Sequence, residues 1–407
     1  MMAQQKNKPL HGIKVVEFST YVAAPVCARM LADMGAEVIK IESFHGDPWR
    51  ENAKSSTFTG DEENPVFDIY NAGKKSICLD LKHPDGMAVL LEMLKDTDVF
   101  ITNIRPKSLK KLKLDYESIR PNHPQMIYGT ITGYGSKGPD ADSPGFDTVA
   151  YWTRSGFLMD MAVKSEGSYP ILCPTGVGDS ITGGMLYGGI MTALFNRERT
   201  GEGEYVTASL YNTGIWTLAS MIIQAQDRYH VRFPKERWEA SPFGTAYRCA
   251  DGEWVSISVL DYGRFQKTVF RILDIEEEMA GFDVGTPTKM KQQSRQIIPI
   301  LERAFLKKTS KEWVAELKAA DIVCSVLNHM NDVSKDEQAV VNQFVQEYTF
   351  PTGATCMLPC PPIRLASQPA PLAVHTPGIG EDTREILGSM GYTEAQINEL
   401  TGKKAIR

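Results

Sequence analysis

Ile13-Lys14-Val15-Val16-Glu17-Phe18, near the start of the chain, is a run of β-forming residues. Pro25 then begins a segment with apolar residues at helical spacing, and Gly35 ends it. A second β-forming run follows as Glu37-Val38-Ile39-Lys40-Ile41-Glu42. A strand, a helix and a strand within about 30 residues predict a βαβ unit, in which the two strands lie parallel.

The turn after the first of these strands reads Thr20-Tyr21-Val22-Ala23-Ala24-Pro25. Dinucleotide-binding folds carry a G-x-G-x-x-G fingerprint at this place, because glycine lets the backbone approach the pyrophosphate. The fingerprint is missing, which argues against a nicotinamide-dependent dehydrogenase.

The alternation of strands and helices continues beyond this unit. Further strands are expected at Ser76–Leu81, Val99–Thr102, Met126–Thr132 and Tyr205–Leu210. The pattern predicts an α/β fold, with a mostly parallel sheet in a Rossmann-like large domain. Ligands bind beyond the carboxyl ends of such strands, so the loops after Phe18, Leu81, Thr102 and Thr132 are the candidate site. Phe44–Phe67 is polar and irregular and is expected to be a loop over that site.

A change of composition near residue 230 indicates a second domain. Two β-forming runs flank Asp251-Gly252, which predicts a β-hairpin. Helices are expected at 262–273 and 292–307, and Thr309-Ser310-Lys311-Glu312 has the pattern of a capping box. We therefore predict a large domain over 1–229, a smaller α+β domain over 230–325, and a return to the large domain over 326–407. The last segment should form two short helices that pack on the large domain.

Composition limits the classes of partner. The net charge of -6 argues against nucleic acid, and no apolar stretch is long enough to span a membrane. The seven cysteines are scattered and form no zinc-binding pattern, so neither a metal nor disulfides are expected. These features, with no secretory signal at the start, predict a cytoplasmic protein. Lys74 and Lys75 are expected to be ordinary solvated side chains unless they reach phosphates.

Near the middle of the chain, Gly176-Val177-Gly178-Asp179-Ser180-Ile181-Thr182-Gly183-Gly184 holds one carboxylate among small and apolar residues. An apolar helical segment follows it. Asp179 has two interpretations, as the N-cap of that helix or as a nucleophile at its entrance. Under both, the positive end of the helix dipole should keep the carboxylate ionised, and the glycines should allow close packing.

Several segments together resemble the class III CoA-transferase family, which includes formyl-CoA transferases and carnitine CoA-transferases. No single motif is specific, but their order and spacing are, from about residue 11 to His375-Thr376-Pro377-Gly378. The segments are Gly12–Phe18, Ala24-Pro25, Asp33–Glu42, Asn71–Ser76, Leu79–Lys82, Asp98–Asn103, Gly133-Tyr134-Gly135 and Gly178-Asp179. Within the family, the chain is most similar to the 2-hydroxyacyl-CoA transferases of anaerobic amino-acid fermentation, which act on phenyllactate or 2-hydroxyisocaproate.

The resemblance implies an interlocked homodimer, acyl-CoA and free carboxylic acid substrates, Asp179 as nucleophile, and no cofactor besides the CoA thioester substrate. It places CoA contacts on Val22, Ala23, Leu79, Asp80, Leu81, Lys82, Asn103, Arg105, Lys111, Thr132, Gly133, Tyr134 and Gly135. Formyl-CoA transferases carry Arg where this chain has Ser43 and Lys111, and Lys lacks the planar fork of Arg. They also carry a glycine run that is missing near 245–262, so formate and oxalate are less expected as substrates.

A carboxylate nucleophile fits the chemistry, because it can carry an acyl group and then CoA between a thioester and a free acid. Backbone N–H groups of Gly135 and of the 178–184 turn are candidate oxyanion donors. Tyr21, Trp49, Phe146, Tyr151 and Trp152 could line an acyl pocket or belong to the core.

Three alternatives stay open. The first is a CoA-transferase for another acid, carnitine-like or dicarboxylic. The second is a 2-methylacyl-CoA racemase of the same fold, but racemases carry His-Asp where this chain has Phe146-Asp147, and Phe cannot exchange a proton. The third is a non-catalytic acyl-CoA-binding protein, which would not need Asp179.

Overall fold

The computed structural model describes residues 8–57, 63–166, 169–367 and 375–407. The chain forms two compact units. The first unit consists of Met1–Phe157, Leu172–Ile223 and Glu337–Arg407, and the second consists of Leu158–Ile171 and Gln224–Asp336.

The main segment of the second unit is Gln224–Asp336, whereas the sequence prediction places the small domain over 230–325. Leu158–Ile171, which the sequence prediction places in the large domain, belongs to the second unit. Lys164 accounts for this, because its backbone N–H donates to the carbonyl of Lys235 at 2.8 Å and its strand-like bridge pairs with Glu236.

Six strands among the described residues form one parallel sheet in the first unit, in the order β3-β2-β1-β4-β5-β6. The strands are β1 Lys14–Phe18, β2 Glu37–Glu42, β3 Lys75–Cys78, β4 Val99–Thr102, β5 Ile127–Thr132 and β6 Tyr205–Ser209. This is the order of dinucleotide-binding Rossmann folds, in which the direction of winding reverses between β1 and β4. The predicted α/β class and Rossmann-like sheet are confirmed.

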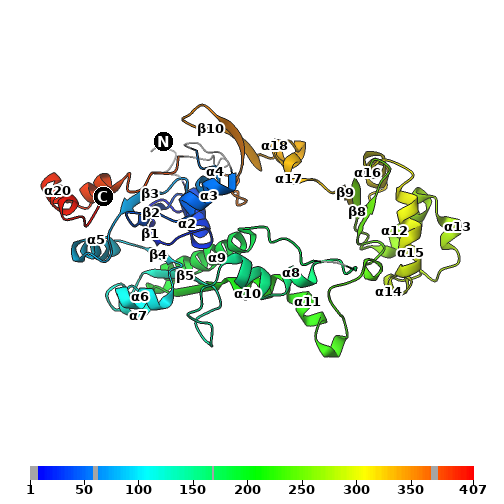
Figure 1. Ribbon diagram of the computed structural model, residues 1–407, viewed down its shortest axis with the longest axis horizontal. Coiled ribbons are helices and arrows are strands. Elements are labelled where there is room, and N and C mark those ends of the chain that lie inside the picture. Colours follow the sequence, from blue (N-terminus) through cyan, green and yellow to red (C-terminus); the bar gives the residue numbers. More distant parts are fainter. Residues whose placement is uncertain (1–7, 58–62, 167–168, 368–374) are drawn as a thin grey trace. The chain divides into compact units, whose positions relative to one another are not determined.

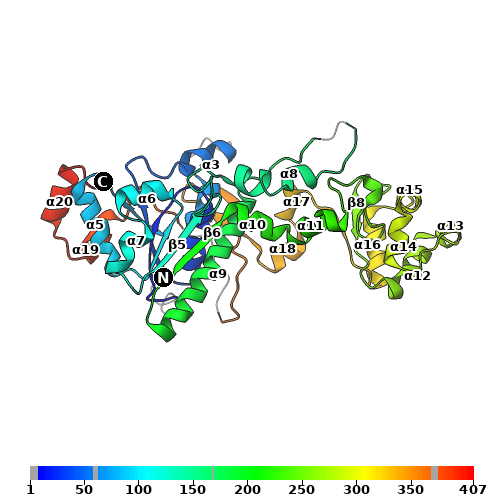
Figure 2. The same ribbon diagram turned by 90° about the horizontal axis from the view of Figure 1, so that it is seen from below.

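Helices cover both faces of this sheet (Figures 1 and 2). On one face, α2 (Ala23–Asp33) and α9 (Val177–Thr200) pack against side chains such as Val15 and Ile127. On the other, Val16 and its neighbours meet α5 Pro84–Leu94, α6 Pro106–Leu112, α7 Tyr116–Ile119, α19 Thr383–Ser389 and α20 Glu394–Gly402. The two C-terminal helices therefore pack on the large domain, as predicted.

The remaining elements of this unit lie at the edges of the sheet or in its connections. They are α3 Trp49–Thr57, α4 Pro65–Asn71, the 3-10 turn η1 Arg120–Asn122, the π-helical turn η2 Asp147–Thr153, α10 Leu210–Thr217, α11 Ala219–Gln224, α18 Glu337–Val341, and the antiparallel pair β10 Val345–Thr349 and β11 Thr355–Pro359. Helix α8 (Phe157–Asp160) begins at the boundary with the second unit.

The prediction of an irregular loop over Phe44–Phe67 is wrong, because this segment contains α3 and the start of α4. Asn64 caps α4 by accepting a hydrogen bond from the N–H of Phe67 at 3.4 Å, and Pro65 occupies the first helical position. Residues 58–62 lie outside the described part. The expectation that Lys74 is solvated is also wrong, since only 5% of its surface is exposed.

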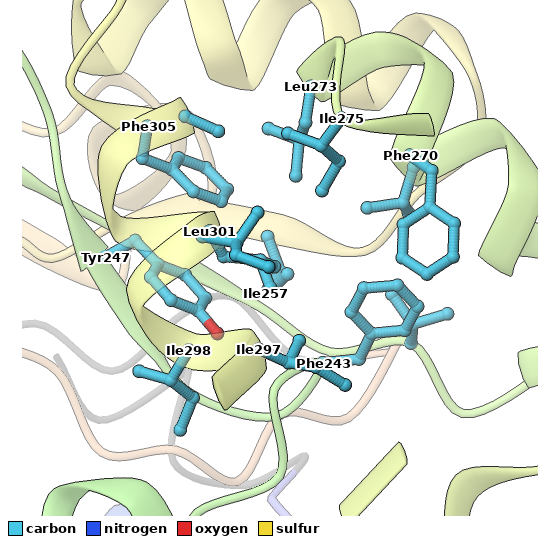
Figure 3. Close-up of a cluster of buried hydrophobic side chains, with 14 of the residues drawn as sticks. Phe243, Tyr247, Ile257, Phe270, Leu273, Ile275, Ile297, Ile298, Leu301 and Phe305 are labelled. Carbon is cyan, nitrogen blue, oxygen red and sulfur yellow. The ribbon is translucent and has the colours of Figure 1, made fainter. Parts of the chain in front are cut away.

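The second unit has its own sheet and core. Its antiparallel sheet runs β7-β8-β9, and the predicted hairpin around Gly252 joins β7 to β8. Tyr247 stacks on Phe305 at 4.8 Å between ring centroids, inside the apolar cluster of Figure 3. The capping box at Thr309 is present. The elements are β7 Ala246–Arg248, β8 Trp254–Ile257, β9 Cys324–Val326, η3 Asp227–Tyr229, η4 Arg237–Glu239, α12 Tyr262–Leu273, α13 Glu276–Met279, α14 Pro287–Gln292, α15 Ser294–Phe305, α16 Ser310–Ala319 and α17 Met330–Val333.

Glycine brings α9 against α2 at one point. A Cβ atom on Gly183 would lie 2.5 Å from the carbonyl oxygen of Ala23 and 2.8 Å from the Cβ of Val26. The next residue, Gly184, has nothing within 4 Å of its Cβ position. The two neighbours on one helix therefore offer a matched comparison.

We expect Gly183→Ala to lower the free energy of unfolding by about 1–3 kcal/mol, because the added methyl group forces the helices apart. Gly184→Ala should raise it by up to about 1 kcal/mol, because alanine favours the helix. Urea denaturation at one fixed protein concentration measures both. Equal effects of the two changes would contradict close packing at Gly183.

Candidate active site

A cavity of about 430 Å³ opens at the carboxyl ends of β1, β4 and β5. Its walls come from the loops that follow these strands, from the start of α10, and from Asp179 in the first turn of α9. The cavity lies where the strand order reverses, which is the usual ligand site of such sheets. Three of the four predicted loops contribute. The loop after Leu81 is not part of the lining, because β3 is the edge strand, two strands away from β1.

Side chains from two other loops hold the backbone of the loop after β1. Asn103 accepts from the N–H of Thr20 at 3.0 Å, and its amide nitrogen donates to the carbonyl of Thr20 at 2.7 Å. Asp47 accepts from the N–H of Tyr21 at 3.0 Å. Tyr21 has φ 64°, a left-handed conformation that costs a bulky residue about 1–2 kcal/mol.

Two aromatic rings form part of the cavity wall. Tyr21 meets Phe146 edge to face at 5.0 Å between centroids, and both residues line the cavity. Trp49 lies behind Tyr21 at 6.3 Å and is outside the lining, while Tyr151 and Trp152 are buried. Of the five aromatic candidates for an acyl pocket, the structure therefore brings Tyr21 and Phe146 to the cavity.

Residues 133–145 form a loop that supplies another wall. A Cβ on Gly133 would lie 2.7 Å from the Cα of Gly145, so the two ends of the loop touch at their glycines. The loop presents Asp142 and Ser143 to the cavity. Sequence reasoning missed these side chains, although the two glycines were a usable signal for closure of the loop.

Asp179 is the third residue of α9 and not its N-cap. The cap is Gly176, with φ 84°, and no side-chain hydrogen bond caps the helix from that position. Instead, the buried carboxylate of Asp147 accepts from the N–H of Gly176 at 2.8 Å. The N-cap interpretation of Asp179 is therefore wrong, because a residue 32 positions earlier provides the carboxylate at the helix start.

Gly178 allows the carboxylate of Asp147 to approach the first turn of α9. A Cβ atom there would lie 2.2 Å from Oδ1 of Asp147 and 2.3 Å from Cγ of Tyr151. Any side chain at this position would displace Asp147 from the first turn of α9. The glycine next to Asp179 thus has a steric reason in this structure.

The environment of Asp179 favours its neutral form. Burial raises its pKa to about 7, and the negative charge of Asp147 adds to the effect. Burial also raises the pKa of Asp147, against the lowering effect of the Gly176 N–H. The helix start therefore stabilises Asp147 by direct hydrogen bonding, and Asp179 is a more basic carboxylate than the sequence led us to expect.

The structure divides the predicted CoA-binding residues into two groups. Those that line the cavity with Asp179 are Ala23, Asn103, Arg105, Thr132 and Gly133. Those outside its lining are Val22, Leu79, Asp80, Leu81, Lys82, Lys111, Tyr134 and Gly135. Val22 and Leu79 are buried in the core, and Lys82 and Lys111 are exposed. Their contacts with CoA stay predictions. Lining residues that the sequence did not single out for the site are Thr20, Ile104, Pro106, Ser108, Ile131, 141–145 and Leu210.

Within the described residues, His, Cys, Asp and Glu side chains form no group of three or more that could hold a metal ion. None of the helices in that part of the chain is long and apolar enough to cross a membrane.

Comparison with known proteins identifies the family. The sequence model of CoA-transferase family III matches residues 10–383. The chain belongs to this family. It is 35% identical to the (R)-2-hydroxy-4-methylpentanoate CoA-transferase of Clostridioides difficile, over 98% of this chain and 99% of that protein. It is 36% identical to the cinnamoyl-CoA:phenyllactate CoA-transferase of Clostridium sporogenes, over 97% and 96%.

A solved structure shares the fold of this chain. A variant of Rv3272 from Mycobacterium tuberculosis superposes with a TM-score of 0.80 and 26% identity, over 93% of this chain and 98% of that one. This class III CoA-transferase is therefore an enzyme of the transferase class, and the predicted resemblance to 2-hydroxyacyl-CoA transferases is confirmed.

Proposed function

We propose that this enzyme transfers CoA from an acyl-CoA or enoyl-CoA donor to a 2-hydroxy carboxylic acid, with Asp179 as the nucleophile. The observation that carries the proposal is the position of Asp179, whose carboxylate lines the cavity at the reversal of the strand order. No other carboxylate on the cavity wall that the structure describes shares the first turn of α9; Asp142 lies on the 133–145 loop.

The reaction proceeds through two anhydrides and an aspartyl-CoA thioester on Asp179. The Asp179 carboxylate attacks the thioester carbonyl of the donor, which forms an aspartyl–acyl anhydride and releases CoA thiolate. The thiolate attacks the Asp179 carbonyl of the anhydride, giving an aspartyl-CoA thioester and the free donor acid. The acceptor carboxylate then attacks this thioester, which forms a second anhydride and releases CoA thiolate again. The thiolate attacks the acceptor's carbonyl in this anhydride, giving the acceptor's CoA thioester and restoring the Asp179 carboxylate. Coenzyme A enters as a substrate, and no further cofactor takes part in these steps.

The surroundings of Asp179 suit these steps. A carboxylate with a pKa of about 7 is partly ionised at neutral pH and is a stronger nucleophile than an ordinary aspartate. Arg105 places a cation on the cavity wall, where it can meet a phosphate of CoA. The structure does not support the oxyanion donors expected from the sequence: the N–H of Gly135 donates to Oγ1 of Thr132 at 3.0 Å outside the cavity lining. Residues 178–184 lie within α9 and form no turn, and the N–H of Ser180 donates to the carbonyl of Gly176 at 2.9 Å.

The choice of a 2-hydroxy acid rests on the named substrates of the two relatives and on the cavity wall. Tyr21 and Phe146 offer apolar surface for a side chain, and Thr20 and Ser143 also belong to the lining. The Ser143 hydroxyl donates to Asp140 at 3.0 Å, so it could only accept a hydrogen bond from an α-hydroxyl. By the same likeness, we place the enzyme in amino-acid fermentation, and the scattered cysteines favour the cytoplasm. Carnitine-like or dicarboxylic acids are the alternative acceptors.

The racemase alternative has less support. Phe146 supplies no titrating group, and Asp147 is 4% exposed and bound to the N–H of Gly176. Asp147 is therefore not placed to exchange a proton with a substrate in the cavity.

We expect incubation with an acyl-CoA donor, followed by hydroxylamine and proteolysis, to give a hydroxamate on Asp179. Asp179→Asn should lower the rate of CoA transfer by about 1,000-fold or more, because an amide is not a nucleophile here. Mass spectrometry locates the hydroxamate, and circular dichroism checks the fold.

The control for this experiment is Asp142→Asn, which removes another cavity carboxylate and should leave the hydroxamate on Asp179. Transfer that survives in Asp179→Asn would end the proposal. A panel of 2-hydroxy acids, enoates, dicarboxylates and fatty acids as acceptors tests the substrate class in the same assay. Preference for any other class would replace the 2-hydroxy acid.

We expect kcat/KM to fall as the pH is lowered through about 7, because protonation of Asp179 removes the nucleophile. Asp147→Asn should move this acid limb to lower pH, because the neighbouring negative charge is lost while an oxygen remains for the Gly176 N–H. Asp142→Asn should leave the limb in place. If the acid limb lies at the same pH in Asp147→Asn as in the wild-type enzyme, the charge of Asp147 does not act on Asp179.

We also propose a homodimer. Phe195 on α9 and Trp216 on α10 are large apolar side chains that are about 70% exposed in the single chain, at 69% and 71%. Sedimentation equilibrium should give twice the chain mass of 45.2 kDa. A monomer at micromolar concentration would be the contrary result.

A further inference from the structure

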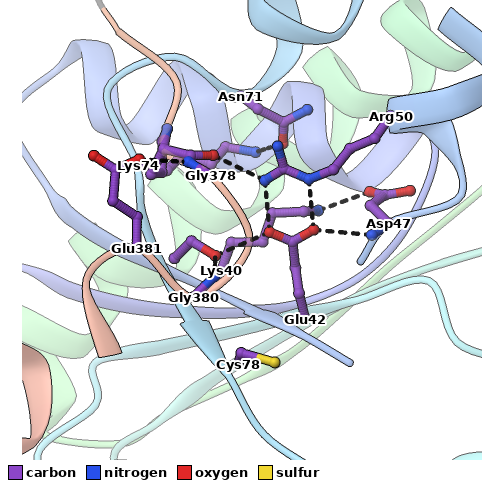
Figure 4. A network of polar contacts seen from close by, with 12 residues as sticks. Lys40, Glu42, Asp47, Arg50, Asn71, Lys74, Cys78, Gly378, Gly380 and Glu381 are labelled. Atoms are coloured by element: carbon purple, nitrogen blue, oxygen red, sulfur yellow. Dashed lines mark hydrogen bonds and ion pairs between the residues drawn. The ribbon is translucent and has the colours of Figure 1, made fainter. Parts of the chain in front are cut away.

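A network of buried charges lies beneath the cavity loop that follows β1 (Figure 4). At its centre is Lys40 of β2, whose side chain is 2% exposed. Its Nζ lies 3.0 Å from Glu17 Oε1, 3.0 Å from Asp47 Oδ2 and 3.1 Å from the carbonyl of Ser19. The contacts with Glu17 and Ser19 are hydrogen bonds, and the contact with Asp47 is an ion pair. Lys40 therefore fixes one oxygen of Asp47.

The other oxygen of Asp47 faces the cavity loop. Asp47 Oδ1 accepts from the N–H of Tyr21 at 3.0 Å and from the N–H of Trp49 at 2.9 Å. The carboxylate is 2% exposed, so water does not compete for these bonds. Asp47 thus links a buried cation to the backbone of Tyr21.

A second ion pair holds the backbone of Asp47 in turn. Glu42 Oε1 accepts from the N–H of Asp47 at 2.8 Å and from Nε of Arg50 at 2.9 Å. Arg50 also donates to Glu42 Oε2 at 2.7 Å and to the carbonyl of Pro377 at 2.9 Å. Contacts other than those with Tyr21 therefore hold both the main chain and the side chain of Asp47 in place.

Tyr21 is the residue of the cavity wall that needs such support. Its left-handed φ of 64° is unfavourable for a bulky side chain and persists only where the surroundings impose it. With this backbone, its ring meets Phe146 in the lining of the cavity to which Asp179 also belongs. A relaxed backbone would move the ring away from that wall.

We propose that Asp47 is a positioning residue for CoA transfer, which acts by holding Tyr21 in its left-handed conformation at the cavity. The proposal rests on the proposed function of the cavity at Asp179. Asp47 itself is outside the lining and touches the reaction only through Tyr21. Its contribution should therefore disappear when Tyr21 is replaced by glycine, which has no ring and adopts a positive φ freely.

A double-mutant cycle on kcat/KM tests this dependence, using the full-length enzyme. Asp47→Ala should lower kcat/KM by about 10- to 100-fold, because a displacement of the wall of about 1 Å has effects of this size. In the Tyr21→Gly background, the same change should alter kcat/KM by less than about twofold. Equal losses in the two backgrounds, or no loss in the wild-type background, would overturn the proposal.

Asp98→Ala is the matched control. Asp98 also accepts a backbone hydrogen bond, from Lys14 at 2.8 Å, and pairs with Arg197 at 2.9 Å. It directly precedes β4, at the amino end of the strand, whereas the cavity lies at the carboxyl ends. Asp98→Ala should lower the melting temperature and leave kcat/KM of the folded enzyme within about twofold. An equal loss of kcat/KM in this variant would mean that general destabilisation explains the effect of Asp47.

Asp47→Asn covers the case in which Asp47→Ala does not fold. It keeps an acceptor for the N–H of Tyr21 and loses the charge that pairs with Lys40. We therefore expect a smaller loss of kcat/KM, which should again disappear in the Tyr21→Gly background. The hydroxamate on Asp179 is measured in the same wild-type sample. A wild-type enzyme without it refutes the covalent mechanism, whereas a labelled, active enzyme with equal losses in both backgrounds refutes only the role of Asp47.

Discussion

The close approach of α9 to the rest of the large domain determines where Asp179 lies. Glycine at three contacts allows this approach, because it has no side chain to hold the elements apart. Gly183 meets the carbonyl of Ala23, Gly189 meets Val206, and Gly129 of β5 meets Ile190. A Cβ at any of these glycines would lie within 3 Å of its neighbour. Because the helix lies so close to β5 and α2, its first turn reaches the carboxyl ends of the strands, where the loops after β1 and β4 already face each other.

This placement creates a competition between two carboxylates for one helix start. Asp147 takes the N–H of Gly176 and is buried. Asp179 lies in the same turn of the helix. Its burial and the negative charge of Asp147 both raise its pKa. The helix start thus separates the roles of two similar side chains. One accepts a hydrogen bond from the helix start, and the other lines the cavity.

The sequence predicted the parts of this arrangement that depend on local pattern. Periodicity identified the strands, turn chemistry identified the hairpin at Gly252, and the capping box located the start of α16. Asp179 was visible as the single carboxylate of a glycine-rich helix start. Asp147 was noticed only as a partner of Phe146, because its contact with Gly176 spans 29 residues and depends on tertiary packing. The order of the strands, which excludes the loop after Leu81 from the cavity lining, is likewise absent from local pattern.

Lys40 and Lys74 show the same limit from another side. In the sequence, a lysine in a strand or beside another lysine indicates a solvated face, yet both are buried and share Glu17 at 3.0 and 2.7 Å. Burial of these charges is not a route to high stability, since apolar groups of similar volume often do as well. Burial lowers the pKa of Lys74 to about 8, and the two lysines hold the pKa of Glu17 at about 2, against the effect of burial on that carboxylate. What apolar groups would lack is direction: a methyl group in place of Oδ1 of Asp47 would fill the same space but would accept no hydrogen bond from Tyr21. The charges are therefore best understood by what they orient, which is the loop that lines the cavity together with Asp179.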